Sequence, residues 1–140
     1  MGICITSNYK GAPSLYGSCS MLLRIREVVA LKWDQEFGEH YQTLRRCYCR
    51  EDYRAFDKKA TEILSVERFN PDDQDMVDFL LSSEDEGKAS YKTAKKILDL
   101  LKDYTSPNTL AYQYYSNDDW EVFKTLLKGC YSHRANLIWR

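Results

Sequence analysis

Residues 21–37, MLLRIREVVALKWDQEF, carry the most regular apolar pattern of the chain. Apolar side chains recur there at steps of three or four residues, the spacing that gathers side chains on one face of an α helix. Gly38 follows, and glycine in a helix interior costs about 1 kcal/mol relative to alanine, so we predict a kink or a break between Lys32 and Gly38. The predicted helix starts near Met21 and buries one stripe, made of Leu22, Ile25, Val29, Trp33 and Phe37.

Four more helical segments are predicted downstream, each with apolar residues at helical spacing. Asn70 is followed by Pro71 and two acids, a strong helix start, because asparagine caps the first N–H groups and proline fits the first turn. Ser90 and Ser116 occupy similar capping positions before two further apolar stripes. The segments cover residues 51–64, 71–81, 91–104 and 117–130.

Short apolar runs at the two ends of the chain are interpreted as strands, over residues 1–6 and 135–140. Neither strand would be stable alone, so we expect them to pair with each other. The sequence therefore predicts an α+β fold that is mainly α, with four to five helices and a short two-stranded sheet formed by the N- and C-terminal segments. Residues 1–140 are predicted to form a single domain.

The overall composition narrows the class of function. The chain of 140 residues has 20 basic and 21 acidic side chains, and a net charge of -1 argues against a general binder of nucleic-acid backbones. The mean hydropathy is -0.58, and no apolar run approaches the roughly 18 residues that a membrane span needs. The five cysteines include no Cys-x-x-Cys pair, and the N-terminus shows no signal-peptide pattern. We therefore expect a cytoplasmic protein with free thiols, no metal and no cofactor, and no membrane or nucleic acid as partner.

Residues 14–20, SLYGSCS, are predicted to be a loop that leads from the first strand into the helix at residues 21–37. Free N–H groups and the dipole at a helix N-terminus attract anions, with Arg24 about one turn further in. If the terminal strands pair, His133 comes to the same end of the molecule. Helix capping by the serines alone is the alternative interpretation. The candidate ligand-binding residues are Asn8, Lys10, Tyr16, Gly17, Ser18, Ser20, Arg24 and His133.

A second candidate surface lies in residues 44–50, where arginines alternate with an aromatic residue. Such a pattern is typical of surfaces that contact acidic partners or nucleic acid. Two acids, Glu51 and Asp52, follow at once, so a solvated helix face is the alternative. The candidate partner-binding residues are Arg45, Arg46, Tyr48 and Arg50.

Catalytic patterns are weak in this sequence. Cys19 lies at a predicted helix start, which favours a thiolate, but His40 and His133 are its only candidate bases and neither forms a Cys-His-Asn signature. With Gly87 as its sixth residue, a calcium loop would start at Ser82 and end at Thr93, and both positions lack the acid that calcium needs there, so we set this interpretation of residues 82–90 aside. We interpret them as a corner between two helices with Gly87 in a left-handed conformation. We therefore expect no enzymatic activity.

Four short motifs are spread over most of the chain: Met1-Gly2-Ile3, Tyr16-Gly17 leading into Leu22-Leu23-Arg24, EFGEHY at residues 36–41, and Asp78-Phe79-Leu80 with the acidic corner and a helix to Tyr104. Together they resemble small uncharacterised proteins of phages and prophages of Gram-positive bacteria. In that pattern the acidic corner is more often Asp-x-Asp-Gly after His-Ser, whereas this chain has SEDEG at residues 83–87. The resemblance implies no catalytic residue.

The resemblance implies a phage accessory protein, a class in which inhibitors of host defence are frequent. We therefore expect a non-enzymatic binding protein that inhibits a host protein or sequesters a small anionic ligand. One alternative is a small enzyme that acts on a nucleotide or phosphorylated substrate. A structural or assembly subunit, which would form homo-oligomers, is the other.

Overall fold

The computed structural model describes residues 2–65, 69–104 and 117–140, with the side chains of Asn117 and Asp118 left undescribed. Within these residues there are six α helices and four β strands, so the predicted mainly helical α+β class is confirmed. The prediction of four to five helices and two strands undercounts both. The elements are β1 (Gly2–Thr6), β2 (Leu15–Ser18), α1 (Cys19–Trp33), α2 (Gln35–Gln42), the 3₁₀ turn η1 (Thr43–Arg46), α3 (Arg50–Leu64), the 3₁₀ turn η2 (Pro71–Asp73), α4 (Gln74–Leu81), β3 (Gly87–Ala89), α5 (Tyr91–Leu101), α6 (Asn117–His133) and β4 (Leu137–Trp139).

The four strands form one antiparallel sheet in the order β2-β1-β4-β3. The predicted pairing of the terminal segments is confirmed, with Ile5 opposite Trp139 and Thr6 opposite Ile138. Cys4 and Arg140 extend this pairing by exchanging two backbone hydrogen bonds of 2.8 and 3.1 Å. The two ends of the chain therefore form the centre of the sheet, with β2 and β3 at its edges.

Both edge strands correct a prediction. Residues 15–18 were predicted as loop but form β2, and the corner at residues 82–90 contains β3. Gly87 is not left-handed; among the described residues Gly11 is the glycine with positive φ, at 81°. A Cβ on Gly87 would lie 2.4 Å from the ring of Trp139, so this glycine allows β3 to lie against a buried indole. The two edge strands, LYGS in β2 and GKA in β3, are too short to show an alternating pattern. Their pairing with the neighbouring strands of the sheet stabilises them.

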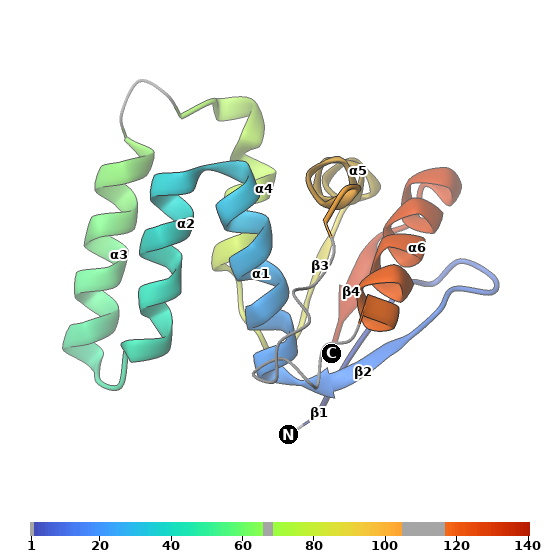
Figure 1. The fold of residues 1–140 in the computed structure, drawn as a ribbon, viewed down its shortest axis with the longest axis horizontal. Helices are drawn as coiled ribbons and strands as arrows, with labels where there is room; N and C mark the ends of the chain where they lie inside the picture. Colours follow the sequence, from blue (N-terminus) through green and yellow to red (C-terminus); the bar gives the residue numbers. More distant parts are fainter. Residues whose placement is uncertain (1, 66–68, 105–116) are drawn as a thin grey trace.

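Helices lie on both sides of α1 (Figure 1). In the view of Figure 1, α2 and α3 are to its left, and α5 and α6 are to its right beside the sheet. Contacts join α1 to α2 and α5, and they join α5 to α6. One core runs through these elements, and its largest buried side chains are Trp139, Tyr41, Phe37, Phe123 and Ile5.

The predicted break after the first long helix is confirmed, but its cause is Asp34 rather than Gly38. Asp34 has an extended backbone, ends α1, and caps α2 by accepting a 2.9 Å hydrogen bond from the backbone N–H of Phe37. Gly38 has a different role, since a Cβ there would lie 2.5 Å from the Cα of Leu31. The missing side chain therefore lets α2 pack closely against α1.

The predicted helix starts at Asn70 and Ser90 are also confirmed. The side chain of Asn70 accepts from the backbone N–H of Asp72, and that of Ser90 accepts from Thr93. The first turn after Asn70 is the 3₁₀ turn η2, which leads into α4. The predicted cap at Ser116 lies outside the described residues.

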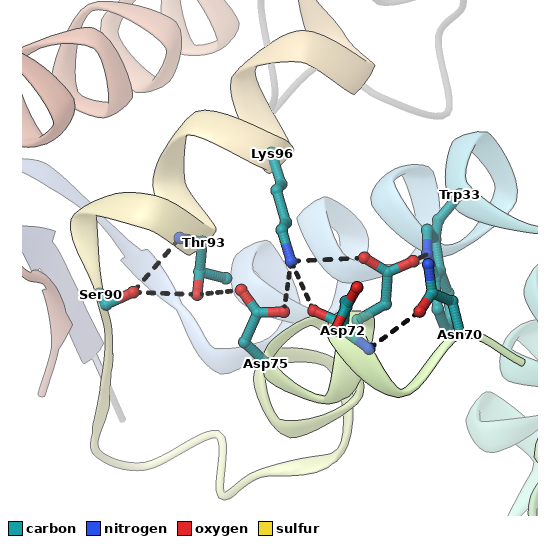
Figure 2. A network of polar contacts seen from close by, with 8 residues as sticks. Trp33, Asn70, Asp72, Asp75, Ser90, Thr93 and Lys96 are labelled. Atoms are coloured by element: carbon teal, nitrogen blue, oxygen red, sulfur yellow. Dashed lines mark hydrogen bonds and ion pairs between the residues drawn. The ribbon is translucent and has the colours of Figure 1, made fainter.

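A polar network joins η2 and α4 to α5 (Figure 2). Lys96 on α5 reaches across to Asp75 and Asp73, with Nζ to carboxylate distances of 2.8 and 3.3 Å. Thr93 donates a 2.7 Å hydrogen bond to the second oxygen of Asp75. Every labelled group of Figure 2 has a partner within the network, so it is explained by its role in the fold.

Candidate functional site

The first predicted site, at residues 14–20, is a strand followed directly by a helix. Ser18 occupies the N-cap position of α1, but its side chain makes no capping hydrogen bond and instead contacts the hydroxyl of Ser20 at 2.5 Å. Gly17 is needed for close packing, because a Cβ there would lie 2.7 Å from the sulfur of Met21. The structure thus replaces the predicted loop with a tight β2–α1 junction.

Little room remains beside this junction. The guanidinium of Arg24 lies 3.6 Å from the carboxylate of Glu27. The cavity next to it, lined by Leu15, Arg24 and Trp120 among others, has a volume of about 10 Å³, which is about the space of one water molecule.

The other predicted ligand residues lie at the opposite end of β2. His133, at the end of α6, stacks on Tyr9 in the β1–β2 loop with 4.5 Å between ring centroids. The neighbours of Tyr9, Asn8 and Lys10, are exposed in the same loop. Trp120, which lines the cavity beside Arg24, lies thirteen residues before His133 on α6, roughly 20 Å at about 1.5 Å per residue, so the length of α6 separates His133 from Arg24. The predicted ligand-binding residues therefore form two groups, with Tyr16 exposed on the strand between them.

The second predicted surface lies in η1 and the turn before α3. Arg45 forms a two-fold contact with Glu27, because its Nε and Nη2 donate to the two carboxylate oxygens of that residue. Glu27 lies on α1 and is only 1 % exposed. Arg45 therefore anchors η1 to α1 although its side chain is still 48 % exposed, and Arg46, Tyr48 and Arg50 are exposed as well.

Tyr48 stands out on this surface because 85 % of it is exposed. Its backbone is nevertheless held in place, since the carboxylate of Asp52 accepts from the N–H groups of Tyr48 and Cys49 at 2.9 and 3.4 Å. The hydrogen bond from Tyr48 is the largest cause that keeps the pKa of Asp52 below its usual value. We call residues 46–50 the Tyr48 turn: an ordered backbone that presents an exposed ring between two arginines.

A third feature was not predicted, a cavity of about 390 Å³ between α1, α3 and the end of α4. We call it the α3–α4 cavity. Its walls are about equally polar and apolar, and three carboxylates lie around it. The lining residues are Leu23, Arg26, Tyr41, Leu44, Tyr53, Phe56, Asp57, Leu80, Leu81, Ser82, Ser83, Glu84 and Asp85.

Arg26 is the least expected member of this cavity wall, being charged and only 3 % exposed. Its guanidinium donates to the carbonyl oxygens of Ser82 and Ser83 at 2.9 and 3.2 Å, at the C-terminus of α4, where a cation is favoured. The rings of Phe79 and Trp139 flank it at 5.5 and 5.4 Å from the ring centroids. Burial lowers the pKa of Arg26, and its Nε–H finds no acceptor among the described residues.

Tyr41 lies beside Arg26 in the same wall and is almost fully buried. Its hydroxyl donates a 2.8 Å hydrogen bond to the carbonyl of Leu80. Burial raises the pKa of Tyr41 to about 12, so this phenol stays protonated at neutral pH. Tyr41 and Arg26 together bind the carbonyl groups that α4 leaves free at its end.

A signal for Arg26 exists in the sequence. Arg26 follows Leu22 by four residues and precedes Val29 by three, so it falls inside the apolar stripe of the first predicted helix. A charged residue in such a stripe indicates a buried partner, but only the tertiary structure shows that the partners are the carbonyl groups of Ser82 and Ser83.

The described residues contain neither a cluster of metal-ligating side chains nor a helix that could span a membrane. No group of three or more His, Cys, Asp or Glu side chains in the described ranges is arranged to hold a metal ion. None of the described helices combines the length and the apolar character of a membrane span.

The chain has no match among known proteins in three comparisons. No protein-family model, curated protein or solved structure matches the chain.

Proposed function

We propose that this chain is a non-enzymatic binding protein of phage or prophage origin that occupies a host protein in the host cytoplasm. The Tyr48 turn is the contact surface of this proposal. The observation that carries it is the ring of Tyr48, 85 % exposed on a backbone that Asp52 holds in place. Covering such an exposed ring with a partner removes a large apolar surface from water, which favours binding.

The composition of the turn supports a protein partner. Tyrosine and arginine are enriched among the residues that dominate binding energy in protein interfaces. The Tyr48 turn presents one exposed tyrosine between Arg46 and Arg50. The two arginines favour a surface with acidic side chains, and this attraction would weaken with salt.

The fixed backbone supports the proposal as well. Ordering a loop on binding costs free energy, and a loop that is already ordered avoids that cost. Asp52 fixes the turn from α3, and the pair of Glu27 and Arg45 fixes η1 from α1. The contact ring is therefore presented by a prearranged segment.

Sequestration of a small anionic ligand, the alternative expectation, has less support. The predicted corner at Arg24 leaves a cavity of only about 10 Å³, and Arg24 lies close to Glu27. A nucleotide would need a much larger space.

Affinity capture from host lysate tests the proposal. Wild type, Tyr48→Ala and Tyr16→Ala proteins would be used in parallel, because Tyr16 is a comparably exposed tyrosine, at 76 %, on another element. We expect one host protein to be captured by wild type and by Tyr16→Ala, with at least about tenfold less by Tyr48→Ala, as for the loss of an interface hot spot. Capture that survives Tyr48→Ala but not Tyr16→Ala would contradict the proposed surface.

A further inference from the structure

The α3–α4 cavity is large enough to receive part of a partner. Its volume of about 390 Å³ lies within the range of about 300–1,000 Å³ that is usual for ligand pockets. Leu44, Phe56 and Leu80 give it apolar walls. Two more apolar groups, Tyr53 and Leu81, are 48 % and 42 % exposed, so apolar surface continues outward from these walls.

The accessible charge of the cavity is negative. Asp57 comes from α3, and Glu84 and Asp85 come from the segment after α4; all three are exposed. The one basic lining residue, Arg26, is 3 % exposed, and its guanidinium faces the Ser82 and Ser83 carbonyl groups. A bound group therefore meets carboxylates first, a charge pattern that is complementary to a cation.

Arg26 closes the inner wall but offers no donor to a bound group. Its terminal N–H groups donate to the Ser82 and Ser83 carbonyl oxygens, and its Nε is buried away from the surface. Polar recognition in this cavity therefore falls to the three carboxylates. A peptide segment that carries lysine or arginine next to a large apolar side chain matches both the carboxylates and the apolar walls.

We infer that the α3–α4 cavity binds a basic peptide segment of the partner protein. In this arrangement an apolar side chain enters between Leu44, Phe56 and Leu80, and lysine or arginine side chains beside it lie over Asp57, Glu84 and Asp85. The inference rests on the proposed function, because it names the partner's chemistry at a second part of the same interface.

The cavity is continuous in the chain with the Tyr48 turn. Leu44 precedes the turn, Tyr53 follows it by one helical turn of α3, and both line the cavity. The turn carries arginines and the cavity carries carboxylates, so a partner needs acidic groups at one place and basic groups at the other. Such two-signed recognition fixes the orientation of a partner and rejects molecules of a single charge.

Two peptides test the cavity with the full-length protein. The probes are acetyl-Lys-Leu-Leu-Lys-amide and its charge-reversed form acetyl-Glu-Leu-Leu-Glu-amide, titrated into ¹⁵N-labelled protein by NMR. We expect the basic peptide to shift the amide signals of residues that line the cavity, such as Leu44 and Ser83. The acidic peptide should bind at least about tenfold more weakly, since the exposed ion pairs with the three carboxylates are replaced by repulsion. Equal or tighter binding of the acidic peptide, no binding of either peptide, or shifts that map elsewhere would overturn the inference.

Variants separate this inference from the proposed function. The double variant Asp57→Asn with Glu84→Gln changes only exposed side chains. It neutralises two of the three carboxylates, so the preference for the basic over the acidic peptide should fall to less than about threefold. Glu62→Gln is the matched control, because Glu62 is exposed on α3 but does not line the cavity. An unchanged preference in the double variant would overturn the inference.

Tyr48→Ala should bind the basic peptide as wild type does, because Tyr48 does not line the cavity. If host capture depends on Tyr48 but the basic peptide does not bind, the proposed function stands and only the cavity inference fails. If the peptide binds in the cavity but Tyr48→Ala captures the host protein normally, the Tyr48 turn is the part that fails.

Discussion

Two adjacent charged residues of α1, Arg26 and Glu27, are buried and point to different partners. Arg26 binds the carbonyl groups at the end of α4, and Glu27 binds Arg45 of η1. Buried charges are costly unless they are paired and hydrogen-bonded. These two side chains therefore specify how α4 and η1 dock on α1.

Removing one partner of the Glu27–Arg45 pair tests this role. We expect Arg45→Ala to lower the free energy of unfolding by roughly 1–3 kcal/mol, the cost of leaving the buried Glu27 carboxylate without these hydrogen bonds, because Arg45 itself is half-exposed and Arg24 still lies 3.6 Å from Glu27. Urea denaturation monitored by circular dichroism measures it. The double variant Glu27→Met with Arg45→Met should recover most of the loss, since an apolar pair of similar size has no buried charge to compensate. A loss under about 0.5 kcal/mol in Arg45→Ala, the range of ordinary surface substitutions, would show that the pair anchors nothing.

Gly87 gives a second prediction about a single residue. A Cβ there would lie 2.4 Å from the Trp139 ring, which is fully buried and has no room to move. Gly87→Ala should therefore destabilise the protein by about 1–3 kcal/mol through overpacking. Gly2→Ala is the control, because the nearest atom to its Cβ would be 3.6 Å away, an ordinary contact. Equal thermal midpoints for the two variants would contradict the packing of β3 on Trp139.

Among the elements, α4 and α5 are joined by the network of Lys96 and Asp75, and this contact depends on pH. Burial raises the pKa of Asp75, but hydrogen bonds from Lys96 and Thr93 outweigh it, so the pKa lies below its usual value. A carboxyl with a lower pKa in the folded than in the unfolded chain stabilises the fold above the unfolded-state pKa of about 3.9, and this stability is lost as pH falls through the folded-state pKa.

We expect wild type to lose more stability than Asp75→Asn when the pH is lowered from 7 to 3. The urea midpoint at the two pH values measures the difference. Asp103→Asn serves as a control for net charge, because Asp103 is exposed and lies outside the network. The account is wrong if Asp75→Asn and wild type show the same dependence on pH.

The elements also show how far the sequence was informative. Asn70, Ser90 and the apolar stripes located five of the six described helices, because caps and helical periodicity are local signals, whereas α2 was not predicted as a helix of its own. The pairing of the terminal strands was predicted because neither could be stable alone. The edge strands β2 and β3 were missed because four and three residues carry no usable pattern, and their pairing partners are set by the tertiary structure.

One candidate site was predicted from the sequence, and the other was found only in the structure. The exposed Tyr48 and its neighbouring arginines were found from an alternating pattern in the sequence, although Arg45 proved to bind Glu27. The α3–α4 cavity was missed because its walls come from α1, α2, η1, α3 and α4, which only the fold brings together. A cavity between distant segments leaves no local signal.

At the scale of the whole molecule, both parts of the proposed binding surface are anchored to α1. The sheet joins both termini and supports α1, and α1 holds η1 through Glu27 and the end of α4 through Arg26. The Tyr48 turn and the α3–α4 cavity both depend on these two anchors. We therefore expect the proposed binding surface to be rigid.

The most direct test of this account is the affinity of the captured host protein for wild type and Tyr48→Ala, measured by isothermal titration calorimetry. The fold should be unaffected, because the Tyr48 side chain is 85 % exposed, and matching thermal midpoints would verify it. The account predicts at least about 30-fold weaker binding for Tyr48→Ala, equivalent to about 2 kcal/mol, the threshold of a hot spot. Affinity that stays within about twofold of wild type would contradict the central claim that the Tyr48 turn is the contact surface.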